Sequence, residues 1–411
     1  MLTRVKPEEV GFSSARLSAV NKLIHGYIRA GLIPGAIAVI ARQGKLVHFN
    51  TYGEMDLEQH KPMREETIFR IHSMTKPLTA IALLILYEQG HFQLSDPVSK
   101  YIPIFKDLKV LEGSHLVAPK RPMTIHDLLT HRAGFSHVLH DSSLGELYRS
   151  ASILKTRGGE NLERFIQKLT QFPLAFHPGA HWHYSLSYNI LAYLVELFSH
   201  MPFDEWMAKK VTAPLSMLDT SFYVPKHKIS RLAVLYTHDH PENQGQSGEV
   251  SPLTLQRMPE TEEILLPPTL LAGGGGLVST ANDYLRFCQM LLNQGELEGN
   301  RIVSRKSIEL MTSQNLPGDL AHIGLNGQRQ YGMGLSGVGY GLGVGIMLNP
   351  AQAQILGTKG DYFWYGIANT SFFIDPQEKI IGIFLTQVKS STRDYSFQRD
   401  FRVAVYQALT S

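Results

Sequence analysis

Residues 68–90, IFRIHSMTKPLTAIALLILYEQG, place a lysine three positions after a serine and then continue almost entirely with apolar residues. Because positions three apart lie on the same side of a helix, the hydroxyl of Ser73 and the amine of Lys76 can touch. Pro77 limits where the helix begins, since proline is tolerated in the first turn but not in the interior. Ser73 is therefore expected at or near the helix N-terminus, where the helix dipole favours negative charge.

The apolar residues behind this pair suggest a chemistry for it. They cover most of the helix circumference from Leu78 to Leu86, which predicts a buried helix. A lysine at the edge of such surroundings is desolvated, which lowers its pKa and lets it act as a base toward Ser73. A second S-x-x-K match, Ser152 to Lys155, has no apolar helix behind it and runs into two glycines, so we interpret it as chance.

Helix and strand patterns occur in three blocks along the chain. A helix capped by Ser13 or Ser14 ends near Gly31, and two strands follow, over residues 35–42 and 45–53. From about residue 70 to 265 helices alternate with loops rich in proline and glycine, and strands then return. The further helices are expected over residues 124–134, 188–200, 203–211, 282–292 and 396–409, and the further strands over residues 337–348 and on both sides of the Asp375–Pro376 turn.

The order of these blocks predicts how the chain is organised. Strands at both ends with a helical middle imply one sheet formed by the two ends of the chain. We expect a discontinuous sheet domain, residues 1–70 and 265–411, and a mainly helical domain, residues 71–264. In the strand over 337–348 glycine alternates, which suits a bare face pressed against another element.

Composition excludes several classes of function. The chain is 43% hydrophobic and 18% charged, and its net charge of +3 gives no electrostatic case for nucleic acid or an anionic membrane. The single cysteine, Cys288, excludes an internal disulfide framework and is expected to pack in the core. The N-terminal residues lack the apolar stretch of a secretion signal, and no run is long enough to span a bilayer, so a cytoplasmic location is the expectation.

Five sequence blocks occur in the order found in serine β-lactamase-like proteins: FRIHSMTKPLTA, TIHDLLTHRAGF, FHPGAHWHYSLSYNILAYLVE, GGGGLVSTANDYLRF and GYGLGVGIMLNP. The chain resembles this superfamily over nearly its whole length. The superfamily includes class C β-lactamases, penicillin-binding proteins and family VIII carboxylesterases. The resemblance implies an α+β fold, with an antiparallel sheet flanked by helices, a helical domain, and the active site between them.

The resemblance also implies a mechanism without a cofactor. The family's S-x-x-K motif falls on Ser73 and Lys76, and its tyrosine falls on Tyr184. Lys76, with Tyr184, would take the proton from Ser73, which attacks a carbonyl and forms an acyl-enzyme. The backbone N–H groups of Ser73 and Ile367 would hold the oxyanion, and Tyr184 would protonate the leaving group.

Two departures from the family pattern bear on the substrate. Leu186 stands where the Y-x-N motif has asparagine, and Trp364, Tyr365 and Gly366 replace the K-T-G strand. β-Lactamases use that asparagine and lysine to hold the amide and the carboxylate of the β-lactam. Leucine and tryptophan imply a more apolar pocket without that cation. Family VIII carboxylesterases resemble the chain at both positions, so an ester with an apolar acyl group is the expected substrate.

A metal site is one alternative to a serine enzyme. Eighteen histidines make it worth testing, and Thr237, His238 and His240 match the start of the metallo-β-lactamase signature T-H-x-H-x-D-H. The signature then breaks, because Glu242 and Asn243 stand where aspartate and histidine are required. We interpret the stretch as a polar loop and expect no metal.

Several other classes of protein were weighed, and the sequence excludes two of them. An α/β-hydrolase would need a G-x-S-x-G pentapeptide, which the chain lacks, and the glycines of 337–345 have no dinucleotide-binding register. A β-lactamase or D-alanyl peptidase and an acyltransferase that uses an alcohol stay open. A non-catalytic scaffold also stays open, although such relatives usually lose the serine, the lysine or the tyrosine. The natural substrate and the oligomeric state do not follow from the sequence.

Overall fold

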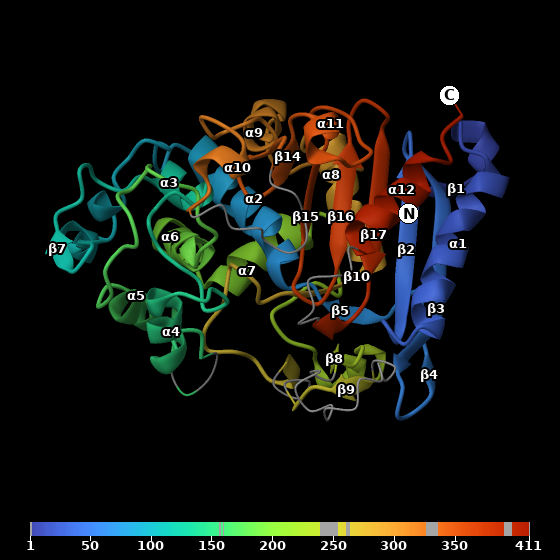
Figure 1. Ribbon diagram of the computed structural model, residues 1–411, viewed down its shortest axis with the longest axis horizontal. Coiled ribbons are helices and arrows are strands. Elements are labelled where there is room, and N and C mark those ends of the chain that lie inside the picture. The colour runs from blue at the N-terminus through green and yellow to red at the C-terminus, as the bar shows by residue number, and fades with distance from the viewer. Residues whose placement is uncertain are drawn as a thin grey trace, which may run out of the picture.

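The centre of the protein is a nine-stranded mixed sheet to which both ends of the chain contribute (Figure 1). The computed structural model describes residues 2–155, 158, 160–238, 254–259, 264–325, 336–389 and 397–410. The strand order is β1-β3-β2-β17-β16-β15-β14-β13, with β4 paired to β3, and among these described strands only β1 and β3 pair in parallel. The strands are β1 (Thr3–Arg4), β2 (Gly35–Arg42), β3 (Lys45–Asp56), β4 (Lys61–Pro62), β13 (Val338–Tyr340), β14 (Gly345–Met347), β15 (Tyr362–Tyr365), β16 (Ser371–Asp375) and β17 (Ile380–Leu385).

The pairing of β2 with β17 joins the two ends of the chain and confirms the predicted single sheet. Every residue of both strands is buried, because helices cover both faces of the sheet. Strands covered on both faces carry continuous apolar runs, which explains GAIAVIAR in β2 and IIGIFL in β17. The domain boundaries near residues 70 and 265 stay a prediction.

Three helices cover the sheet. α1 (Ser14–Arg29) and α12 (Phe397–Tyr406) pack against each other on one face, and α8 (Ala281–Leu292) packs on the other face, behind the sheet in Figure 1. The predicted cap of α1 is confirmed, since the side chain of Ser13 accepts a hydrogen bond from the N–H of Arg16. Cys288 is fully buried in α8, as predicted.

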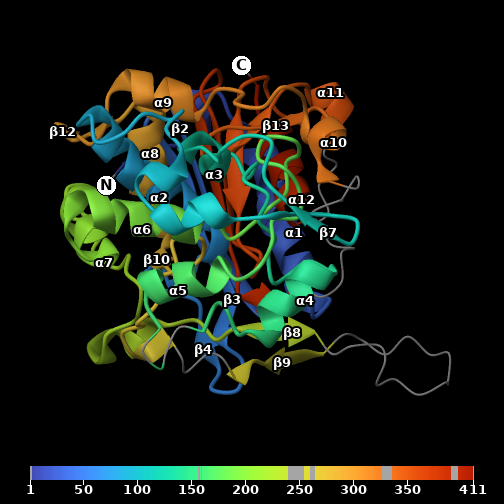
Figure 2. The ribbon, with the colours of Figure 1, turned by 90° about the vertical axis from the view of Figure 1, so that its left-hand side faces the viewer.

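A group of helices lies beside the sheet, at the left in Figure 1, and Figure 2 shows them from that side, in front of the sheet. They are α2 (Thr75–Glu88), α3 (Ile125–Leu129), α4 (Ser143–Ser150), α5 (Leu162–Leu169), α6 (Ser187–Ser199) and α7 (Phe203–Met207), which continues into a π-helical turn, Ala208–Thr212. α2 packs along α6 and is buried at every position from Thr75 to Leu86, as the apolar run predicted. Within the described residues, no helix is both long and apolar enough to cross a membrane.

Shorter elements connect these layers. They are β5 (Ile68–Arg70), paired with β10 (Val278–Thr280); β8 (Tyr236–His238), paired with β9 (Leu255–Arg257) and β18 (Val388–Lys389); β6 (Val110–Glu112) with β7 (His115–Val117); β11 (Glu296–Leu297) with β12 (Asn300–Arg301); and the helices α9 (Arg305–Met311), α10 (Leu320–Ile323) and α11 (Pro350–Ala353). The 3₁₀ turn η2 (His72–Met74) links β5 to α2.

Two predicted elements differ from the structure. The helix expected over residues 124–134 has the predicted capping box of Thr124 and Asp127 but ends at Leu129. The single strand expected over 337–348 is wrong, because this segment folds back on itself as β13 and β14. Gly343 allows the reversal with a positive φ of 92°. The expected bare face of a single strand is therefore wrong as well, but Gly343 does approach another element closely, since a Cβ there would lie 3.2 Å from the carbonyl oxygen of Lys76.

Candidate active site

Ser73 lies in the turn η2 and is in contact with both predicted partners. The Nζ of Lys76 lies 3.2 Å from its Oγ, and the hydroxyl of Tyr184 donates a hydrogen bond to the same oxygen at 2.7 Å. The predicted contact of hydroxyl and amine is therefore confirmed, and Ser73 lies one residue before Met74, the N-cap of α2. Tyr184 reaches Ser73 from the loop before α6, because α6 packs against α2.

Lys76 lies in surroundings that favour a neutral amine. Its side chain is 1% exposed, and burial lowers its pKa well below the usual value of 10.5. Besides Ser73 it contacts the carbonyl oxygen of Gly274, at 2.6 Å, and the ring faces of Tyr184 and Tyr188, at 4.5 and 5.7 Å. These groups hold the amine within reach of Ser73 without supplying a full negative charge, which favours its neutral form.

Four consecutive glycines, Gly273 to Gly276 (the glycine wall), pass beside Lys76, and Gly274 is the one that contacts its amine, a role that our sequence interpretation missed. The N–H of Gly274 donates to the side-chain oxygen of Asn189 at 2.9 Å, which turns its carbonyl toward Lys76. A Cβ on Gly273 would lie 2.6 Å from the carbonyl oxygen of Tyr188, so only glycine permits this approach to α6. The signal was present in the sequence block GGGGLVSTANDYLRF, but glycines alone do not reveal what they approach.

The end of strand β15 packs against the ring of Tyr184. The ring of Trp364 lies 5.9 Å from that of Tyr184 and stacks at 5.0 Å on Tyr365. Neither Trp364, Tyr365 nor Gly366 is among the residues that line the cavity beside Ser73. A Cβ on Gly366 would lie 2.5 Å from the carbonyl oxygen of Ile71, so glycine lets the end of β15 approach the turn that carries Ser73.

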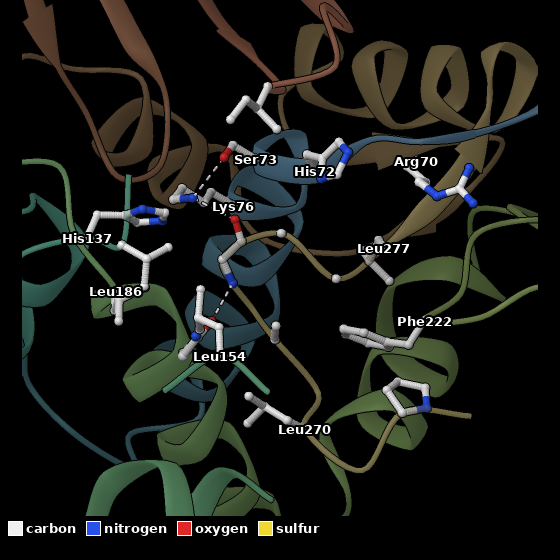
Figure 3. A pocket seen from close by; sticks show the side chains of 18 of the residues that line it. Arg70, His72, Ser73, Lys76, His137, Leu154, Leu186, Phe222, Leu270 and Leu277 are labelled. Atoms are coloured by element: carbon white, nitrogen blue, oxygen red, sulfur yellow. Dashed lines mark hydrogen bonds between the residues drawn. The ribbon is translucent and has the colours of Figure 1, made fainter. Parts of the chain in front are cut away.

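A cavity of about 370 Å³ opens at Ser73 (Figure 3). Its walls are mainly apolar and include Leu154, Leu186, Phe222, Leu270 and Leu277, together with Ile367. Leu186 and Ile367 therefore line it, as predicted. The polar residues that line it are Arg70, His72, Ser73, Lys76, His137, Ser185, Asn189 and Lys389. The cavity lacks the K-T-G lysine, but Arg70 and Lys389 supply other cations, which our sequence interpretation missed.

His137 lines the cavity opposite His72 (Figure 3). Its ring lies 5.5 Å from that of Tyr184, and its Nδ1 accepts a hydrogen bond from the N–H of Leu139 at 3.2 Å. Burial, and then the nearby charge of Lys76, hold the pKa of His137 well below 6.5. The imidazole is therefore neutral at pH 7 and carries its proton on Nε2.

The structure also places the second S-x-x-K match and part of the histidine stretch considered as a metal site. Ser152 and Lys155 are both exposed, which agrees with a chance match. His238 is buried, with its Nε2 3.0 Å from the carbonyl oxygen of Leu32. His240, Glu242 and Asn243 lie outside the described residues. Within the described residues, no group of three or more histidine, cysteine or acidic side chains is arranged to hold a metal ion.

The mixed sheet, the flanking helices and the cavity at an S-x-x-K serine define the fold class of β-lactamases and penicillin-binding proteins. The family model described as Beta-lactamase matches residues 20–407, and the chain therefore belongs to that family. It is 29% identical to Esterase EstB of Burkholderia gladioli over 96% of this chain and 95% of that protein. It is 30% identical to Protein Rv1367c of Mycobacterium tuberculosis, over 87% and 86% of the two chains.

A solved structure extends the comparison. EstCE1, described as a hydrolase with promiscuous acyltransferase activity, aligns with a TM-score of 0.79 and 26% identity over 95% of this chain and 99% of that one. These similarities indicate an enzyme of the serine hydrolase type.

Proposed function

We propose that this protein is a carboxylesterase that works through an acyl-enzyme on Ser73. The observation that carries the proposal is the contact of one serine oxygen with both a buried lysine and a tyrosine at the end of a mainly apolar cavity. The similarity to an esterase over nearly the full length of both chains supports the same reaction class.

In the first step the Oγ of Ser73 attacks the ester carbonyl, and the neutral amine of Lys76 takes the proton of the serine hydroxyl. The carbonyl oxygen becomes an oxyanion, which the backbone N–H groups of Ser73 and Ile367 are proposed to hold. Ile367 supports this assignment because it lines the cavity beside Ser73. One such donor is typically worth about 3 kcal/mol of barrier.

In the second step the tetrahedral intermediate collapses and the alcohol leaves. Tyr184 gives its proton to the alcohol oxygen and regains one from Lys76, which held the proton of Ser73. Water then attacks the acyl carbonyl by the reverse route, and Ser73 is restored. The short contact of Tyr184 with the serine oxygen supports this role.

Acyl transfer to an alcohol is the second candidate, because it shares the acyl-enzyme and differs only in the acceptor. The mainly apolar cavity favours an organic alcohol as well as water, and EstCE1 is described as having both activities. A product whose formation requires added alcohol would distinguish transfer from hydrolysis. β-Lactam or D-alanyl peptide hydrolysis is less favoured, because Leu186 offers no amide to such substrates.

A serine-directed probe and an ester panel test the proposal. A fluorophosphonate should label wild type at Ser73 and should not label Ser73→Ala, while Ser152→Ala, in the other S-x-x-K match, should label normally. p-Nitrophenyl esters from acetate to octanoate, with nitrocefin alongside, should show ester turnover that Ser73→Ala lacks. Labelling at another serine, or full turnover by Ser73→Ala, would overturn the mechanism.

A further inference from the structure

A second cavity, of about 170 Å³, adjoins the cavity at Ser73. Phe222, Pro268 and Leu277 line both cavities, so these three residues form the partition between them. Figure 3 shows Phe222 and Leu277 on the side of the first cavity that lies away from His137. The other residues that line the second cavity come mainly from α7 and the π-helical turn that follows it, and they include Met207, Ala208 and Thr212.

The partition begins beside the nucleophile. The N–H of Ile71 donates a hydrogen bond to the carbonyl oxygen of Leu277 at 3.1 Å, and the N–H of Leu277 donates to the hydroxyl of Thr75 at 3.2 Å. Leu277 is therefore bonded to the chain on both sides of Ser73. An apolar arm of an ester that reacts at Ser73 can lie along Leu277, and it then meets Phe222 in the same partition.

Phe222 is held firmly in this partition. The residue before it, Ser221, exchanges two backbone hydrogen bonds with Val278 of β10, at 2.8 and 3.2 Å. The ring packs directly on the glycine wall, because a Cβ on Gly276 would lie 2.9 Å from the Cδ1 of Phe222. The ring of Phe203 lies 5.6 Å from that of Phe222, which is only 3% exposed. A side chain enclosed in this way stays in place as part of the wall.

We propose that Phe222 limits the length of the apolar arm of the ester, on its acyl or its alcohol side. While the ring is in place, a longer arm finds no space beyond the partition. Without the ring the two cavities join, and the arm gains apolar surface at Met207 and Leu277, both buried. The inference rests on the proposed ester hydrolysis and adds to it a residue that determines which esters are accepted.

Two series of esters test this limit. p-Nitrophenyl esters from acetate to decanoate lengthen the acyl arm, and alkyl acetates from methyl to octyl lengthen the alcohol arm. In wild type, kcat/KM should pass through a maximum in at least one series and fall for longer chains. In Phe222→Ala that maximum should move to a longer chain. The ratio of kcat/KM for an ester two methylenes beyond the wild-type maximum to that at the maximum should rise at least tenfold, since each buried methylene is worth about fourfold in binding.

A matched variant controls for the loss of a core side chain. Phe92 is 2% exposed and lines neither cavity, so Phe92→Ala should leave the chain-length profile unchanged. Because each ratio compares two esters with one variant, partial loss of folded protein cancels. The same profile in Phe222→Ala and wild type, or a wild-type rate that keeps rising with chain length in both series, would overturn the proposal.

Filling the second cavity tests whether the longer arm enters it. Ala208 lines only the second of the two cavities and is exposed, so the chain can accept a larger side chain there. Ala208→Phe alone should keep the wild-type profile, because Phe222 separates the cavities. Added to Phe222→Ala, it should move the maximum back toward shorter chains. A shift caused by Ala208→Phe alone, or no reversal in the double variant, would contradict the proposed partition.

A binding experiment separates this inference from the proposed function. Equilibrium dialysis with Ser73→Ala measures the affinities of methyl octanoate and methyl butyrate without turnover. Adding Phe222→Ala to that background should raise the ratio of the two affinities at least tenfold in favour of the octanoate. If wild type hydrolyses no ester, the proposed function fails and this comparison still decides whether Phe222 limits the arm. An unchanged ratio would contradict the limit.

Discussion

The Nζ of Lys76 donates a hydrogen bond to the backbone carbonyl oxygen of Gly274, at 2.6 Å, and lies 3.2 Å from the Oγ of Ser73. A neutral amine has two N–H bonds and one lone pair. Because Gly274 takes one N–H, the lone pair can turn toward the serine proton. A glycine far along the chain therefore orients the proposed base, and Asn189 in turn orients the glycine.

Replacing Lys76 should remove activity and stabilise the fold. Lys76→Met removes the proposed base, so kcat for a p-nitrophenyl ester should fall at least 10²-fold. The unfolded chain binds a proton on this lysine up to pH near 10.5, whereas the buried amine loses it at a pH well below that value. The free energy of unfolding of wild type therefore rises with pH between the lowered pKa of the folded protein and 10.5. At pH 7 the folded protein is destabilised, because Lys76 must either be buried with its charge or lose its proton on folding.

Urea unfolding at pH 7 and pH 10 measures this effect. At pH 7, Lys76→Met should have a free energy of unfolding about 1 kcal/mol higher than wild type. Each unit by which the pKa is lowered costs wild type about 1.4 kcal/mol, and the variant loses part of this gain because the contacts of the lysine amine are gone. The advantage should shrink at pH 10. A variant less stable than wild type at pH 7, or an advantage that grows with pH, would contradict the assignment of a depressed lysine pKa.

Removing the hydroxyl of Tyr184 should impair proton transfer. Tyr184→Phe keeps the ring packed on Trp364 but loses the hydrogen bond to Ser73, so kcat should fall by about 10²- to 10⁴-fold with a smaller change in KM. Steady-state kinetics on one p-nitrophenyl ester provide the measurement. Tyr362→Phe is the matched control, because its buried hydroxyl has no partner among the described residues and the variant should retain activity. Equal kcat values in the two variants would exclude Tyr184 from the reaction.

Two glycine substitutions should have opposite effects on stability. Gly273→Ala places a Cβ 2.6 Å from the carbonyl oxygen of Tyr188, so α6 and the glycine wall must separate, at a cost of about 1–3 kcal/mol. Gly26→Ala lies within α1 with no atom within 4 Å of the new Cβ, and it should gain up to about 1 kcal/mol from helix propensity. Thermal unfolding of both variants is the test. A neutral Gly273→Ala would show that the close approach to α6 is not required.

Several features followed from the sequence because neighbouring residues decide them. The cap of α1 by Ser13, the turn between β2 and β3, and the strands on either side of the Asp375–Pro376 turn are confirmed. The contact of Ser73 with Lys76 is also confirmed. It depends only on helical spacing and on the position of Pro77, which limits where the helix begins. Tyr184 was assigned through family resemblance, since its 111-residue separation from Ser73 leaves no local pattern.

Tertiary structure decided what surrounds that pair. Gly274 lies 198 residues from the lysine it orients, and the hairpin of β13 and β14 replaces a strand that alternation alone predicted as continuous. Arg70 and Lys389 line the same cavity because Gln387, directly before β18, hydrogen-bonds with the backbone of Arg70 at the end of β5. Periodicity and capping report interactions within a few residues of the chain, so the sequence by itself determined most of the elements and the contact of Ser73 with Lys76. Contacts between distant segments depend on how those elements pack, and they alone decided the cavity and the residues that line it.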